Sequence, residues 1–258
     1  MITSSSNKQV KNIISLNKKS KARKESDLFV VEGVKMFAEA PRECIDQVYV
    51  SETFISKQDS KHILGDIKYE VLEDQVFLNV SDTKTPQGIL CLVKQFHYNA
   101  MDIIKKNNAH IIVLEDLQDP GNLGTIMRAG EGAGISGVIL GNNCVDIYNP
   151  KTIRSTMGSI YRVPFVYAEN LIEMLNILKE NQITTYAAHL KQSKNYENLN
   201  FTKSIAFMIG NEGNGLSDEL SSMADQYLKI PMAGKVESLN AAVAASILMF
   251  ETSRQRRI

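Results

Sequence analysis

Apolar and polar positions fall into two blocks along the chain, and the first block predicts a small α/β domain. Between Leu28 and Lys94, short apolar runs alternate with amphipathic stretches, a pattern typical of strands connected by helices. The runs expected to form strands are LFVVEG, QVYVS, KYEVL and GILCLVK. The stretches expected to form helices are VKMFAEA, ETFISKQDSKHI and EDQVFLNVS. The length of this block suits a compact domain of ordinary size.

The second block predicts a mostly parallel sheet. A polar stretch at 98–107 interrupts the pattern, and we expect it to link a domain over 1–97 to one over 108–258. The strands expected there are HIIVLE, SGVILG, RVPFVYA, ITTYAAHL, SIAFMIG and YLKIPM. The helices expected are NLGTIMRAGEGAG, NPKTIRSTMGSIY and AENLIEMLNILKEN. Continuous apolar strands with crossover helices indicate a sheet covered on both faces, and such sheets bind ligands at the carboxyl ends of their strands.

Composition narrows the class of protein. The 258 residues are 43% hydrophobic and 22% charged, which is typical of a globular chain. Neither a membrane span nor the apolar core of a secretory signal is visible, so we expect a cytoplasmic protein. Cys44, Cys91 and Cys144 are odd in number and widely spaced, so neither a disulfide framework nor a metal site is indicated.

Charge is distributed unevenly although the formal net charge is zero. Zero net charge argues against a protein that coats nucleic acid. The first 24 residues nevertheless carry basic side chains and no acidic one, and a second basic cluster ends the chain. These residues are Lys8, Lys11, Lys18, Lys19, Lys21, Arg23 and Lys24, and then Arg254, Arg256 and Arg257. Each cluster is either a solvated terminus or a local phosphate contact, and charge alone does not decide between them.

The first unusual turn follows the strand HIIVLE. Asp119-Pro120-Gly121-Asn122 is a strong turn signal, and a capped strand-to-helix turn explains it without any function. Arg128 is harder to explain in that way, because it stands in a helix of small residues six positions after Asn122. An anionic partner for Arg128 is the interpretation we favour over a simple salt bridge.

The second unusual turn is glycine-rich and runs from Gly210 to Gly215. It lacks the Lys-Ser/Thr pair of a P-loop and the spacing of a dinucleotide fingerprint, and Glu212 would repel phosphate. Closely spaced glycines let backbone amides approach a ligand. The turn therefore favours an adenosine-like or zwitterionic ligand over a triphosphate.

The third unusual turn leads from Ile230-Pro231-Met232 into the apolar helix AAVAASILMF. Ser238 and Asn240 stand at the start of that helix. Both are favoured N-cap residues, but one helix needs only one cap, so the second polar residue is left for chemistry. The helix is apolar nearly all round, which predicts that it is buried, with a second chain as one way to cover it.

These three turns, in this order, resemble the motifs of the SpoU/TrmH branch of the SPOUT methyltransferases, over about 108–258. RSTMGS at 154–159 is similar to a further family element, and FVVEGVKMFAEA resembles the small ribosomal-protein-like substrate-binding domain of many members. The resemblance implies an α/β fold: a parallel-sheet SPOUT domain with a trefoil knot, preceded by that small domain. It also implies S-adenosylmethionine as methyl donor, a ribose 2′-hydroxyl of RNA as acceptor, no metal, and a homodimer formed through the C-terminal helix.

The resemblance also implies roles for individual residues. The expected catalytic set is Asn122, Arg128, Glu212, Ser238 and Asn240. The expected donor-binding set is Gly210, Glu212, Gly213, Ile230, Met232, Ser238, Leu239 and Asn240. The expected RNA contacts are Lys18, Lys19, Lys21, Arg23 and Arg128. Glu212 would orient Arg128 or other site groups, and Arg128 would fix a phosphate, since a guanidinium stays protonated and is a poor base. Gly130-Glu131 departs from the small residues that usually follow this arginine in the family.

Three alternatives remain at this point. Ribosomal RNA is the first expectation for the substrate because of the added N-terminal domain, and transfer RNA is the second. A non-catalytic RNA-binding module is a further alternative, which the intact set of polar site residues argues against. A nucleotide-cofactor oxidoreductase would need an early glycine fingerprint followed by an acidic ribose ligand, and neither is present.

Overall fold

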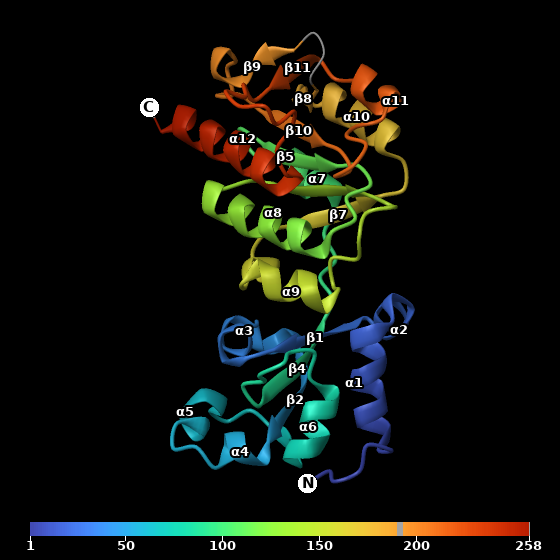
Figure 1. The fold of residues 1–258 in the computed structure, drawn as a ribbon, viewed down its shortest axis with the longest axis vertical. Coiled ribbons are helices and arrows are strands. Elements are labelled where there is room, and N and C mark those ends of the chain that lie inside the picture. Colours follow the sequence, from blue (N-terminus) through green and yellow to red (C-terminus); the bar gives the residue numbers. More distant parts are fainter. Residues whose placement is uncertain (190–192, 258) are drawn as a thin grey trace. The chain divides into compact units, whose positions relative to one another are not determined.

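The computed structural model describes residues 1–189 and 193–257, which form two compact units. The N-terminal unit comprises 1–96 and 146–161, and the C-terminal unit comprises 97–145 and 162–258. Both units are α/β (Figure 1). The expected boundaries at 97 and 108 follow chain order, whereas the units are discontinuous because the segment 146–161 packs with the N-terminal sheet.

The N-terminal unit is built on a 4-stranded sheet in the order β1-β4-β2-β3. Its strands are β1 (Leu28–Glu32), β2 (Ile45–Ser51), β3 (Tyr69–Leu72) and β4 (Ile89–Lys94). The β1–β4 and β2–β4 pairs are antiparallel, and the β2–β3 pair is parallel. Its helices are α1 (Lys8–Lys18), α2 (Ser20–Ser26), α3 (Val34–Glu39), α4 (Glu52–Ile55), α5 (Ser60–Leu64), α6 (Asp74–Val80) and α9 (Pro150–Thr156). Short 3-10 turns are η1 (Arg42–Cys44) and η2 (Ser159–Tyr161).

Helix α1 packs its apolar stripe on this sheet. Val10, Ile13 and Leu16 are fully buried, and they belong to one cluster with Leu90 and Leu92 of β4. The i, i+3, i+6 spacing of the α1 residues places them on one helix face. The opposite face carries lysines, so α1 presents a basic surface to solvent.

The segment 146–161 joins the N-terminal unit through polar and aromatic contacts. Tyr148 packs its ring 4.7 Å from that of Phe29, and the backbone N–H of Phe96 donates to its hydroxyl at 2.6 Å. Tyr161 donates from its hydroxyl to the carbonyl of Met36 at 2.9 Å. These contacts explain why this stretch groups with residues more than 50 positions earlier in the chain.

The C-terminal unit is built on a 7-stranded sheet in the order β7-β6-β5-β10-β8-β11-β9, and its pairs are parallel. Its strands are β5 (His110–Leu114), β6 (Gly137–Gly141), β7 (Phe165–Ala168), β8 (Thr184–Ala188), β9 (Lys194–Asn195), β10 (Ile205–Ile209) and β11 (Gln226–Lys229). Its helices are α7 (Ala100–Ile104), α8 (Pro120–Ala133), α10 (Leu171–Glu180), α11 (Asp218–Ser222) and α12 (Ala241–Arg256), with a 3-10 turn η3 (Tyr196–Asn198).

Helices cover this sheet as the apolar strands require. Leu175 and Leu178 of α10 and Leu220 of α11 share one core with Ala206 and Met208 of β10. Helices α8 and α12 lie side by side, in green and red in Figure 1, and pack against each other. A Cβ at Gly130 would lie 2.4 Å from the side chain of Ile135, so the glycine leaves room for the chain that turns back after α8.

The predicted parallel α/β fold is confirmed, and the differences are local. Every expected strand and helix has a counterpart, except that the end of ITTYAAHL, Leu190, lies outside the described residues. A short helix, α7, lies in the expected linker, with Ile103 and Ile104 buried in the C-terminal core. Within the described ranges, no helix is long and apolar enough to cross a membrane. The trefoil knot stays a prediction.

Candidate active site

The three unusual turns meet at the carboxyl edge of the parallel sheet. Residue Asn122 follows β5, the glycine-rich turn follows β10, and Ile230 follows β11. Strands β5, β10, β8 and β11 are consecutive neighbours in the sheet. Parallel neighbours end at one edge, so turns distant in sequence come together there.

A pocket of about 490 Å³ opens at this edge, a volume typical of small-molecule sites. Most of the expected donor-binding residues line it, namely Gly210, Glu212, Gly213, Ile230, Met232, Ser238 and Leu239. Asn240 is not part of the lining. The pocket also takes in residues that the sequence did not single out, including His189, Asn211, Asp218, Lys229 and Glu237.

The glycine-rich turn is folded on itself. Asn211 and Gly215 exchange backbone hydrogen bonds of 3.0 and 2.9 Å, and the side-chain oxygen of Asn211 accepts from the N–H of Gly213 at 2.8 Å. Only glycine fits at 210, since a Cβ there would lie 2.0 Å from the carbonyl carbon of Gly215. The turn is therefore a rigid wall of backbone along the pocket, as the spacing of its glycines indicated.

A directed chain of hydrogen bonds links the three turns. The Asn122 side-chain amide donates to Glu212 Oε1 at 2.9 Å, and the Asn240 amide donates to Asn122 Oδ1 at 3.0 Å. Asn240 Oδ1 accepts from the N–H of Ala242 at 2.9 Å. An ionised carboxylate only accepts and a backbone N–H only donates, so the two ends of the chain fix the orientation of both amides.

Glu212 is held in the ionised state by this chain. Partial burial acts to raise the pKa of Glu212, but donors from Asn122, Asp119 and Gln118 outweigh it and keep the pKa below its ordinary value. The N–H groups of Asp119 and Gln118 donate to its carboxylate at 3.0 and 3.2 Å. Glu212 thus anchors Asn122 and the start of α8, whereas the sequence expected it to orient Arg128 or other groups.

Asn240 and Ser238 have different environments. Asn240 is the N-cap of α12 and also donates to Asn122, so one residue serves the helix and the site together. Ser238 is exposed, lines the pocket, and makes no hydrogen bond within the described part of the chain. One of the two polar residues therefore caps the helix, as expected, and a chemical role for Ser238 stays a prediction.

Arg128 is an exposed cation on α8. Its guanidinium makes no hydrogen bond or ion pair with any residue that the structure describes, and it does not line the pocket. A simple salt bridge, the alternative considered from sequence, is therefore not its role in this structure. An exposed, unpaired guanidinium is suited to a phosphate.

The expected RNA contacts of the N-terminal unit divide into two groups. Lys18, Lys19 and Lys21 are exposed at the junction of α1 and α2. Arg23 is only 3% exposed, and its Nε and Nη2 donate to Asp146 Oδ2 at 2.9 and 2.5 Å. Its Nη1 donates to the carbonyl of Leu16 at 2.6 Å. The Arg23 guanidinium is buried and donates from all three of its nitrogens to groups of the protein, so it does not face an RNA phosphate, and the expectation of an RNA contact at Arg23 is corrected.

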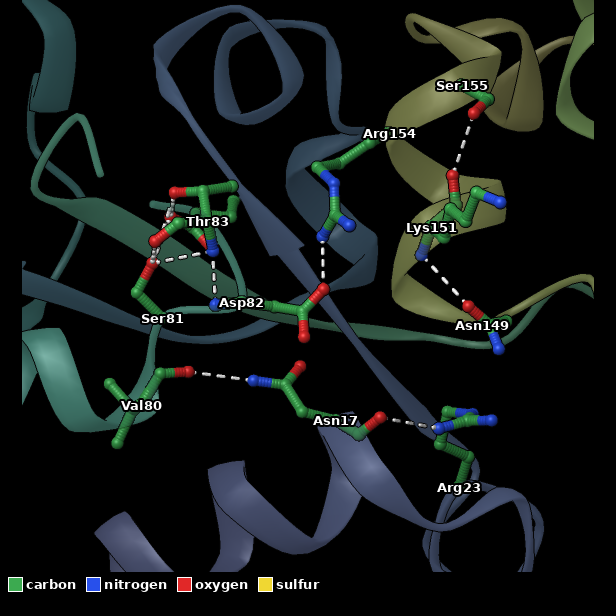
Figure 2. A network of polar contacts seen from close by, with 11 residues as sticks. Asn17, Arg23, Val80, Ser81, Asp82, Thr83, Asn149, Lys151, Arg154 and Ser155 are labelled. Carbon is green, nitrogen blue, oxygen red and sulfur yellow. Dashed lines mark hydrogen bonds and ion pairs between the residues drawn. The ribbon is translucent and has the colours of Figure 1, made fainter. Parts of the chain in front are cut away.

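Figure 2 shows the polar contacts around Arg23 and around the family element RSTMGS. Arg154 of α9 donates to Asp82 in the loop after α6 at 2.5 Å, and Ser155 donates to the carbonyl of Lys151 at 2.9 Å. Thr156 and Ser159 are fully buried. The element therefore fastens α9 to the N-terminal unit, a structural role that the sequence did not assign.

Two buried thiols and one arginine have structural roles. Burial raises the pKa of Cys91 to about 12 and that of Cys144 to about 11, so both thiols stay protonated. Arg256, expected in a basic cluster, donates instead to the carbonyls of Phe201 and Lys203 at 3.0 and 2.6 Å. No cluster of His, Cys, Asp or Glu among the described residues has the makings of a metal site.

The missed lining residues carry weak sequence signals. His189 follows β8, and its ring lies 5.3 Å from that of Tyr227. Lys229 ends β11, and Glu237 precedes Ser238. Their position in the sequence could have indicated that they line the pocket, since each of the three lies within two residues of a strand end or an expected motif. Residue type alone did not distinguish them from surface residues.

A parallel sheet with a glycine-walled pocket at its carboxyl edge, braced by a chain of side-chain amides, defines an α/β ligand-binding domain. Comparison with known proteins gives the family. The SpoU rRNA Methylase family model matches residues 109–250, and the MRM3-like substrate binding domain model matches residues 7–91. The chain belongs to the SpoU rRNA methylase family.

Individual relatives cover nearly the whole chain. The 23S rRNA (guanosine(2553)-2′-O)-methyltransferase RlmP of Bacillus subtilis (strain 168) is 32% identical over 253 residues, which are 96% of this chain and 97% of that protein. The AdoMet-bound rRNA methyltransferase from Sinorhizobium meliloti is 30% identical, with a TM-score of 0.85 over 98% of this chain and 97% of that one. AviRb from Streptomyces viridochromogenes, in complex with AdoMet, has a TM-score of 0.87 at 23% identity over 97% and 98%, and shows the shared fold.

Proposed function

We propose that the chain transfers a methyl group from S-adenosylmethionine to a ribose 2′-hydroxyl of ribosomal RNA. The observation that carries the proposal is the chain Glu212–Asn122–Asn240, which ties three turns into one wall beside a pocket, with unpaired Arg128 on the same helix as Asn122. The substrate class rests on the relative from Bacillus subtilis, which is named as a 23S rRNA 2′-O-methyltransferase.

The pocket fits S-adenosylmethionine in size and charge. Its volume of about 490 Å³ suits a ligand of this kind, and its backbone wall at Gly210 and Gly213 permits close approach. Glu212, Asp218 and Glu237 place carboxylates around a donor that carries a sulfonium and an ammonium group. We assign the donor to Gly210, Glu212, Gly213, Ile230, Met232, Ser238 and Leu239, with Asn240 bracing the wall.

The protein's residues orient the acceptor, and the proton of its hydroxyl leaves without passing to a side chain. S-adenosylmethionine supplies an activated methyl group when bound. The Asn122 and Asn240 pair holds the ribose side of the site, Ser238 offers its unused hydroxyl near the attacked oxygen, and Arg128 fixes the adjacent phosphate. Because a guanidinium does not deprotonate, the hydroxyl proton passes to that phosphate or to water. Alignment of the two reactants supplies much of the rate.

The N-terminal unit is the RNA-binding part in this proposal. The family model for a substrate binding domain matches residues 7–91, and Lys18, Lys19 and Lys21 are exposed there. A few lysines fix the position of RNA without base readout. We assign substrate binding to 1–97, on which the segment 146–161 also packs, and methyl transfer to 108–258, whose core takes in α7 of the stretch 98–107. A ribosomal RNA substrate places the protein in the cytoplasm.

A homodimer through α12 is the assembly we propose. Val243 and Phe250 of α12 are 46% and 47% exposed, seven positions apart and thus on one helix face. A second copy would cover this face. Phe250→Glu should give monomers in sedimentation analysis, whereas Leu78→Glu, at a residue of α6 that is 51% exposed, should leave the dimer intact. A monomeric wild-type protein would refute the assembly.

The function is tested with RNA from a strain that lacks the gene. Purified protein and labelled S-adenosylmethionine are incubated with ribosomal and transfer RNA separately, and the labelled nucleotide is mapped. Label at a ribose 2′-oxygen of ribosomal RNA supports the proposal, and label in transfer RNA alone assigns the substrate differently. If titration calorimetry detects no binding of the donor and no RNA is labelled, the chain is a binding module.

A further inference from the structure

Helix α8 carries an acidic residue one turn beyond its exposed arginine. Glu131 follows Arg128 by three positions, and residues three apart on a helix are neighbours on its surface. A carboxylate in that position can pair with the guanidinium and compete with RNA phosphate for it. Arg128 can therefore stay available to RNA only if another group engages the Glu131 carboxylate.

Arg162 provides that feature. It stands between η2 and β7, and it donates from Nε to Glu131 Oε1 and from Nη2 to Glu131 Oε2 at 3.2 Å. Both carboxylate oxygens are thereby engaged in a fork-shaped contact. Glu131 and Arg162 side chains are 35% and 44% exposed, so the pair lies at the surface beside Arg128.

The two observations are complementary. Glu131 is occupied by an arginine 31 positions later in the chain, and Arg128 makes no ion pair among the described residues. Without Arg162, the nearest unengaged carboxylate on α8 would be Glu131, and its charge would both attract Arg128 and repel RNA phosphate. A half-exposed ion pair adds little stability, so stabilisation alone is a weak reason for this contact.

We propose that Arg162 is a positioning residue that neutralises Glu131 and so keeps the Arg128 guanidinium available to the RNA backbone. This inference rests on the proposed function, because it assigns RNA phosphate as the partner of Arg128. It predicts an asymmetry between two partners of one ion pair. Loss of the arginine harms the enzyme, while loss of the carboxylate does not.

Three variants of the full chain test it: Arg162→Gln, Glu131→Gln and the double variant. For Arg162→Gln, kcat/KM for RNA should fall about two- to five-fold at low salt, the size of a surface charge effect, with the donor Kd unchanged. Glu131→Gln should stay within about two-fold of wild type, and the double variant should recover. The Arg162→Gln defect should shrink at about 1 M salt, where the Debye length is about 3 Å.

A second readout is independent of catalysis. Phenylglyoxal modifies accessible, unpaired guanidinium groups, and mass spectrometry of peptides gives the rate at Arg128 alone. That rate should fall in Arg162→Gln and recover in the double variant. If wild type labels no RNA but the modification rates follow this order, the proposed function fails and the pairing claim survives.

The opposite outcomes overturn the inference. Equal losses in Arg162→Gln and Glu131→Gln with no recovery in the double variant would identify a bridge that merely supports the fold. Loss in Arg162→Gln that persists in the double variant would mean that Arg162 contacts RNA itself. An unchanged kcat/KM and an unchanged modification rate in Arg162→Gln would show that Glu131 does not compete for Arg128.

Discussion

Asn240 donates its side-chain amide to Asn122 Oδ1 at 3.0 Å across a separation of 118 residues, and Asn122 donates to Glu212. Each member of this chain has one permitted orientation, because Glu212 accepts at one end and the N–H groups of α12 donate at the other. The cap of the last helix and the geometry of the site are therefore one structural feature. A change at Asn240 acts on both, and the two effects can be separated.

Asn240→Asp should preserve the cap of α12 and remove the hydrogen bond that position 240 donates to Asn122. An Asp oxygen still accepts from the N–H groups of α12, so the free energy of unfolding should stay within about 0.5 kcal/mol of wild type. Its carboxylate cannot donate to Asn122, so methyl transfer should fall at least about ten-fold. Asn240→Ala should lose transfer and also about 1 kcal/mol of stability. Denaturant unfolding and single-turnover transfer measure both, and full activity in Asn240→Asp would contradict the role of the chain.

Arg128→Ala should abolish transfer and leave donor binding nearly intact. The guanidinium is exposed, lies outside the pocket lining and has no partner among the described residues, so its removal costs the fold little. Titration with S-adenosylmethionine and transfer to RNA are the two measurements. Arg128→Lys, which keeps the charge but not the fork, should retain part of the activity. Loss of donor binding in Arg128→Ala would mean that Arg128 contacts S-adenosylmethionine and not RNA phosphate.

Arg256→Ala should destabilise the C-terminal unit. Its guanidinium donates to the carbonyls of Phe201, Asn108 and Lys203 at 3.0, 2.6 and 2.6 Å, and so joins the end of α12 to the segments before β5 and β10. Removal should lower the free energy of unfolding by about 2 kcal/mol. Arg257→Ala is the matched control and should cost less than about 0.5 kcal/mol, since among the described residues the Arg257 side chain bonds only to the carbonyl of Ser253, one turn earlier. Equal effects would mean that Arg256 is a solvated residue.

His110 should make the stability depend on pH. Burial first, and the Arg256 charge second, lower the pKa of His110 from 6.5 to about 3. Below pH 6.5 His110 takes up a proton in the unfolded chain but not in the folded chain. The contribution of His110 to the free energy of unfolding is therefore complete above pH 6.5 and is lost as the pH falls towards 3. Between pH 7 and pH 5 this amounts to about 2 kcal/mol. In His110→Phe, which keeps a buried ring beside Phe207, the fall between these pH values should be smaller by that amount. The same pH slope in wild type and variant would contradict it.

Most strands and helices were predicted from local pattern, but α1 was not, although Val10, Ile13 and Leu16 give it a regular buried stripe. The apolar runs that form β5, β6 and β10 are fully buried in the sheet, and continuous burial is what a parallel strand requires. Short elements such as β9 and α11 escaped prediction because two to five residues carry too little periodicity. The expectation at Arg23 failed for a different reason. In the sequence Arg23 stands among lysines, which predicts exposure to solvent. Its burial depends on an ion pair with Asp146, which lies far away in the chain.

The sequence by itself determined the alternation of strands and helices, the three turns with unusual residue types, and the resemblance that they carry, because each of these depends on residues close together in the chain. Tertiary structure alone decided which donor faces which acceptor. In the folded protein Asn240 donates to Asn122, Arg162 pairs with Glu131, and Arg23 is buried against Asp146. Hydrogen bonds and ion pairs depend on distances of about 3 Å between atoms, and chain order does not fix such distances between residues that lie far apart in sequence.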